Sequence, residues 1–102
     1  MKKFQIRSWE GVLPDGKKTQ ESLVSVLSYI ISVSANNLPN GMEQFRFLRR
    51  MAEAFDNAEK TKTLELEDKD HTLLKDLLEK NIPPRWALSK DIAGVVEEFM
   101  SL

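Results

Sequence analysis

The side chains best suited to chemistry gather around the single histidine of the chain. Glu67, Asp68 and Asp70 all lie within four positions of His71. Calcium loops alternate oxygen ligands around a central glycine, and residues 68–72 contain no glycine. Zinc would need a second histidine or a cysteine, and the sequence has neither. We therefore interpret the acidic residues as a helix N-terminus, where they complement the helix dipole, and we expect no metal and no cofactor.

The sequence also contains no clear set of residues for covalent or acid–base catalysis. Serines are plentiful, but only His71 could act as their base, and no Gly-x-Ser-x-Gly motif is present. No pair among the 16 acidic residues stands out as a general acid and base. The glycines are too scattered to form a phosphate-binding loop: Gly11, Gly16, Gly41 and Gly94. We therefore expect a protein that is not an enzyme.

Three arginines of one predicted helix could contact phosphate groups. Arg46, Arg49 and Arg50 have helical spacing and share a face, which is the arrangement that phosphate contacts need. The whole chain is nearly neutral, however, with 15 basic and 16 acidic residues, so no strong field attracts nucleic acid. A solvated face, paired with Glu43 or Glu53, is the interpretation of the arginines that we favour. A small nucleic-acid-binding regulator using these arginines is the alternative function.

Aromatic residues indicate a second buried surface. Phe45 and Phe47 point about 200° apart on a helix, so one of them must face something other than the core that buries the other. Trp86 follows two prolines and Arg85, and tryptophan and arginine are the commonest anchors of protein interfaces. We predict that a surface with Phe47 or Trp86, flanked by Arg85, is buried against a partner or a second copy. The alternative is that both rings fill one monomer core.

Alternating residues predict short strands at two places. Phe4 and Ile6 alternate with polar residues near the N-terminus, and residues 61–67 alternate again, with Leu64 and Leu66 on one side. The Leu-Pro-Asp-Gly stretch at residues 13–16 predicts a turn, because proline presets φ and glycine accepts positive φ. This turn closes a predicted hairpin over residues 11–18.

Four segments have the spacing of amphipathic helices. The first begins after a cap at Thr19 or Ser22, and a loop rich in Asn, Pro and Gly separates it from the second. The third is capped by Asp68, and the fourth begins at Pro84 or after a cap at Ser89. The predicted ranges of the first three are about 23–34, 42–58 and 69–80. The main apolar face of the second helix consists of Phe45, Leu48, Met51, Ala52 and Phe55. Three more residues widen this face: Phe47, Ala54 and Ala58.

Composition places these elements in one small domain. A chain of 102 residues with 41% hydrophobic residues suits a single globular core. No apolar run approaches the length of about 20 residues that a membrane helix needs, and the chain has no cysteine. We expect residues 1–102 to form one soluble cytoplasmic α+β domain. It is mostly helical, with about four helices, a short N-terminal β-hairpin and one further short strand.

Part of this order resembles small proteins encoded by tailed bacteriophages and prophages. The resemblance lies in the Leu-Glu-Leu-Glu-Asp stretch at residues 64–68, the leucine-rich residues 73–78, and the proline and apolar helix that follow. The segment at residues 4–16, with its Asp-Gly turn, is also similar, so about half of the chain is covered. The resemblance implies a phage setting and no particular activity. We therefore expect a non-enzymatic protein–protein interaction protein, a phage accessory or assembly factor that binds a protein partner or self-associates.

Overall fold

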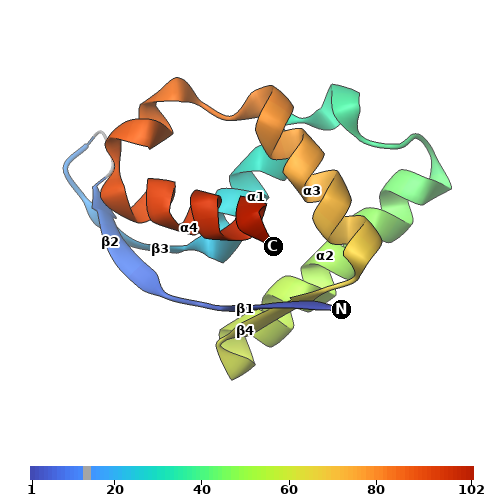
Figure 1. Ribbon diagram of the computed structural model, residues 1–102, viewed down its shortest axis with the longest axis horizontal. Coiled ribbons are helices and arrows are strands. Elements are labelled where there is room, and N and C mark those ends of the chain that lie inside the picture. Colours follow the sequence, from blue (N-terminus) through green and yellow to red (C-terminus); the bar gives the residue numbers. More distant parts are fainter. Residues whose placement is uncertain (13–14) are drawn as a thin grey trace.

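The computed structural model describes residues 1–12 and 15–102 (Figure 1). Its α+β fold confirms the predicted class, with four α-helices and two small antiparallel sheets in the described residues. The strands are β1 (Lys2–Gln5), β2 (Ser8–Val12), β3 (Lys18–Ser22) and β4 (Thr63–Leu66). The α-helices are α1 (Leu23–Val33), α2 (Met42–Thr61), α3 (Asp68–Asn81) and α4 (Lys90–Ser101). Two short 3-10 helices, η1 (Ala35–Asn37) and η2 (Pro84–Leu88), join them.

The first sheet joins the N-terminus to the middle of the chain. β1 and β4 run antiparallel, with Phe4 opposite Leu64. Both of these side chains are buried, as the alternation in each segment predicts. Lys62 adopts a left-handed conformation, with φ of 61°, and its N–H donates to the carbonyl of Ala58. This cap ends α2 and turns the chain directly into β4, so that the strand contacts the helix that precedes it.

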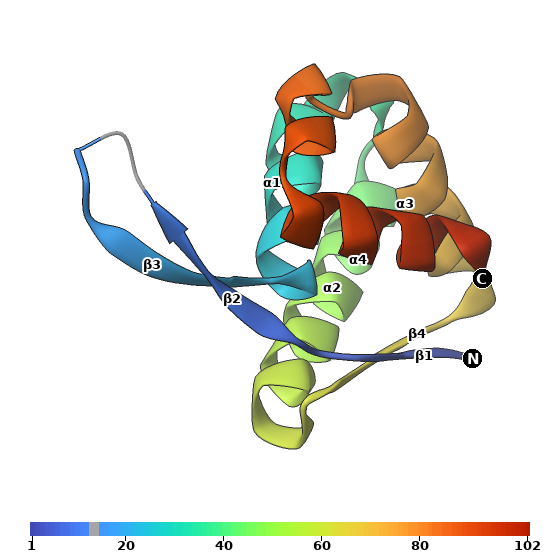
Figure 2. The ribbon, with the colours of Figure 1, turned by 60° about the vertical axis from the view of Figure 1, so that its left-hand side comes forward.

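The second sheet is the predicted hairpin, and it is longer than expected. β2 and β3 pair from Ser8 opposite Ser22 to Val12 opposite Lys18. The indole Nε1 of Trp9 donates to Glu21 Oε2 across the two strands, at 3.2 Å. Figure 2 shows the hairpin projecting away from the helices. Leu13 and Pro14 of the predicted turn lie outside the described residues.

Local side chains define where the helices begin. Ser22 caps α1 in a reciprocal arrangement, because it accepts from the Val24 N–H while Ser25 Oγ accepts from the Ser22 N–H. Ser89 caps α4 through the N–H of Ile92, so the later of the two predicted starts is correct and Pro84 begins η2 instead. The predicted cap at Asp68 is wrong by one residue. Glu67 precedes α3, without a side-chain cap, and Asp68 is its first residue.

One core connects the four α-helices, β1, β4 and η2, and Trp9 of β2 packs against it. The inner face of β1 and β4 packs with α1, α3 and α4, and α2 contributes one side. Figures 1 and 2 show α2 along one flank of the molecule, next to β4. The fully buried large side chains of the core are Phe47, Phe99, Leu27, Ile30, Leu64, Leu66, Leu74, Leu77 and Leu78. This core covers only one side of α2. The residues of α2 that point inward therefore determine which of its residues stay exposed.

Candidate interaction surface

α2 carries two apolar stripes, and the core uses the narrower one. Phe47, Met51 and Ala58 are buried, and Ala54 between them is half-buried. Their spacing of four, three and four residues places them within about 60° of one another at 100° per residue. The turn at Lys62 brings β4 back against α2, and Phe47 lies beside Leu73 of α3. The helix is thereby anchored with Phe47 inward and Phe45 outward.

The second stripe is open to solvent. We call it the exposed α2 row, and it consists of Met42, Phe45, Leu48 and Ala52, ending at the half-buried Phe55. Met42 is 58% exposed, Phe45 57% and Leu48 38%. Large apolar side chains on successive turns of one helix form a ridge that water hydrates poorly. The predicted main apolar face is therefore divided, because Met51 lies in the buried stripe while Phe45, Leu48 and Ala52 lie in the exposed one.

The predicted partner residues lie elsewhere. Phe47 is only 1% exposed and Trp86 8%, so both rings belong to the core of a single chain. The Trp86 ring packs beside Tyr29, with centroids 5.4 Å apart, at a shallow cavity of about 150 Å³. Arg85 lines this cavity and is itself exposed. The expectation that Phe47 or Trp86 forms an exposed docking surface is corrected: the outward member of the phenylalanine pair is Phe45.

The three arginines are separated by the fold. Arg50 donates from Nε and from its terminal NH₂ to the two carboxylate oxygens of Asp70, both at 2.9 Å. The Asp70 side chain is 4% exposed. These hydrogen bonds raise the pKa of the Arg50 guanidinium above its usual value, although burial acts in the opposite direction. Arg46 and Arg49 are exposed. The predicted phosphate-binding face therefore keeps two of its three cations, since Arg50 is engaged in the protein.

His71 is buried in the core. Its Nε2 lies 3.0 Å from the Phe99 carbonyl oxygen and must donate the hydrogen, because a carbonyl only accepts. The Phe99 carbonyl belongs to the last turn of α4, where helix carbonyls lack partners within the helix. The imidazole also packs against the rings of Phe4 and Phe99, at 5.3 and 4.7 Å between centroids. His71 thus fastens the end of α4 to α3 and β1.

The acidic residues near His71 in sequence point away from it. Asp70 pairs with Arg50, and Asp68 lies 3.5 Å from the N-terminal ammonium group. Within residues 1–12 and 15–102, no three His, Asp or Glu side chains come together as metal ligands. The helix-N-terminus interpretation is consistent with this arrangement, because Asp68 and Asp70 both lie in the first turn of α3.

We predict that His71→Ala lowers the free energy of unfolding by about 2–4 kcal/mol, since a buried ring and a hydrogen bond are both lost. Chemical denaturation of the variant and of the wild type measures this. Binding through the exposed α2 row should be unchanged at temperatures where the variant is folded. A variant with wild-type stability that has lost its biological function would contradict this structural role.

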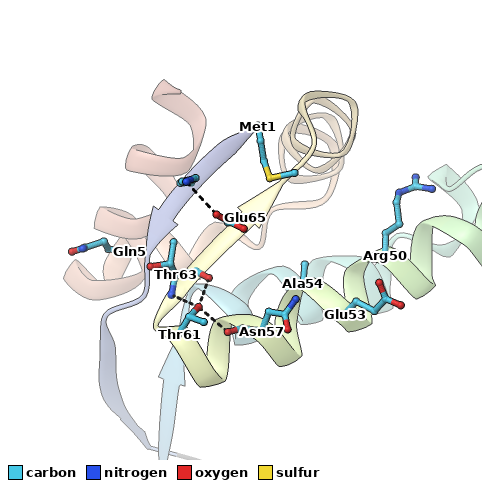
Figure 3. A pocket seen from close by; sticks show the side chains of 10 residues that line it. Met1, Gln5, Arg50, Glu53, Ala54, Asn57, Thr61, Thr63 and Glu65 are labelled. Carbon is cyan, nitrogen blue, oxygen red and sulfur yellow. Dashed lines mark hydrogen bonds and ion pairs between the residues drawn. The ribbon is translucent and has the colours of Figure 1, made fainter.

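A polar groove of about 770 Å³ lies between the outer face of the first sheet and α2 (Figure 3). Lys3 pairs with Glu65 across its strands at 3.3 Å. At the closed end, Thr61 Oγ1 donates to the Asn57 carbonyl and accepts from the Thr63 N–H. The single histidine lies elsewhere, and the described lining brings no nucleophile and base together. Ion pairs and hydrogen bonds engage Lys3, Glu65, Arg50 and Thr61 of its lining, and we assign the groove no chemistry.

No family model, no curated protein and no solved structure matches this chain. None of the helices in the described part of the chain is long and apolar enough to cross a membrane.

Sequence reasoning missed the exposed α2 row as the outward surface, although the 200° between Phe45 and Phe47 was a signal that α2 has two apolar sides. It also missed the pairing of Arg50 with Asp70, for which the sequence holds no signal across 20 residues.

Proposed function

We propose that this is a non-enzymatic interaction protein that binds another protein chain through the exposed α2 row. The observation that carries the proposal is the outward position of Phe45, which leaves 57% of a large aromatic side chain in water between two other exposed apolar residues. Burying such side chains gives about 25 cal/mol per Å² of apolar surface, and aromatic anchors contribute most of the affinity of typical interfaces.

The setting of the row suits a binding surface. It lies on a 20-residue helix that Phe47 and Met51 fix to the core, so a partner would meet side chains held at defined positions. Arg46 and Arg49 border it, and arginine is enriched in interfaces. The resemblance of residues 64–78 to small phage proteins supports an accessory or assembly role of this kind.

Site-specific photo-crosslinking tests this function. A photoreactive phenylalanine analogue replaces Phe45 in cells that produce the protein, and in a control it replaces Leu88, which is 88% exposed in η2. Position 45 should give a discrete product with one protein, and position 88 should not. Leu48→Ser should reduce the yield at position 45 by about tenfold, as expected for a central apolar contact. Equal labelling from both positions, or none at position 45, would contradict the proposal.

Arg46 and Arg49 support nucleic-acid binding as the second candidate, since both are exposed on one side of α2. Binding to mixed DNA and RNA at two salt concentrations distinguishes the two functions. Two phosphate contacts predict a slope of log K against log salt of only about −2. An interaction protein should show no measurable binding at either salt concentration. Tight binding that Arg46→Gln and Arg49→Gln abolish would favour the regulator.

A further inference from the structure

Two opposite charges border the exposed α2 row on one side. Arg49 and Asp56 are seven residues apart, so they project in nearly the same direction, about 10 Å apart along the helix axis. Both side chains are exposed. Neither takes part in an ion pair within the described parts of the chain. One flank of the row therefore offers a cation and an anion to a partner, one before and one after Ala52 along the helix.

We infer that the partner of the row is a second copy of this chain, with the two α2 helices antiparallel about a two-fold axis beside Ala52. This inference rests on the proposed function, because it names the partner of the same row. In this arrangement Arg49 of each copy faces Asp56 of the other, which gives two ion pairs. A parallel two-fold pairing would carry the Arg49–Asp56 flank of the second copy to the opposite side of the seam, so these two ion pairs could not form.

Part of the apolar row fits the same register, whereas Phe45 of each copy lies opposite Glu59 and Lys60 of the other and packs on their aliphatic parts. Ala52 lies next to the axis, where its small side chain allows the two helices to approach closely. Phe55 of each copy then falls between Leu48 and Ala52 of the other, as a knob enters a hole in antiparallel helix packing. The area of this five-residue row is small compared with the roughly 800 Å² that each subunit buries in a standard interface. We therefore expect a dimer with a micromolar dissociation constant that exchanges rapidly with monomer.

Sedimentation velocity over a wide concentration series tests the inference with charge reversals. The wild type should shift from monomer to dimer as its concentration rises. Arg49→Asp and Asp56→Arg should each weaken the dimer by about tenfold or more, because each creates two like-charge contacts. The two reversals together should restore the wild-type dissociation constant to within about threefold, as charge complementarity is regained. Lys90→Asp, an exposed charge on α4 and outside the α2 row, serves as the charge-reversal control and should change it little.

A chain that stays monomeric at every concentration would overturn the inference, as would a double reversal that remains as weak as the single ones. The crosslinking experiment separates this failure from that of the proposed function. A monomeric chain whose position 45 still crosslinks to a different protein keeps the interaction function and loses only the second copy. A monomeric chain with no crosslink at position 45 loses both.

Discussion

Phe47→Asp should leave the protein unfolded at room temperature. The Phe47 side chain is 1% exposed in the centre of the core, so the substitution removes its packing and places a carboxylate where no partner exists. The combined cost is about 5 kcal/mol or more, which is comparable to the whole stability of a domain of this size. Near-ultraviolet circular dichroism and thermal unfolding would measure the loss of the fixed tertiary structure.

Phe45→Asp is the matched control, two positions away in the same helix. Its side chain is 57% exposed, so we expect a folded variant whose free energy of unfolding changes by less than about 1 kcal/mol. The same variant should lose binding through the exposed α2 row. A folded Phe47→Asp variant together with an unfolded Phe45→Asp variant would show that α2 turns its other stripe to the core.

Arg50→Met should lower the free energy of unfolding by about 2–3 kcal/mol and the melting temperature by about 10–20 °C. The physical reason is the Asp70 carboxylate, which is 4% exposed and receives both of its charge-assisted hydrogen bonds here from Arg50. Methionine keeps the aliphatic bulk but leaves this carboxylate without a counter-charge. We expect this loss of stability to lie at the lower end of the range for broken buried ion pairs, because a third of the Arg50 side chain is exposed to solvent. Scanning calorimetry provides the measurement.

Arg46→Met is the control for this prediction, since Arg46 lies one turn earlier and has no ion pair in the described chain. It should change stability by less than about 0.5 kcal/mol. Adding Asp70→Leu to Arg50→Met should recover at least half of the loss, because the unpaired charge is then gone. Equal effects of the two arginine substitutions would mean that the Arg50–Asp70 pair contributes nothing to stability.

Much of the local structure was determined by the sequence itself. The alternation around Phe4 and Leu64 predicts strands, and these residues are buried in β1 and β4. Ser22 and Ser89 were both candidate caps, and each accepts a backbone N–H at the start of a helix. These predictions succeed because strand period and capping depend on residues only a few positions apart, so the interaction and its signal share one short stretch of chain.

The tertiary structure alone decided what the surface presents. Both stripes of α2 have helical spacing, so periodicity could not tell whether Phe45 or Phe47 is inside. The choice was made by segments that are distant from Phe47 in sequence: β4 returns against α2 from the turn at Lys62 and pairs with β1, and Phe47 lies beside Leu73 of α3. The Arg50–Asp70 pair likewise joins two helices 20 residues apart. Burial is a property of the whole packed chain, because a side chain leaves water only when distant segments cover it.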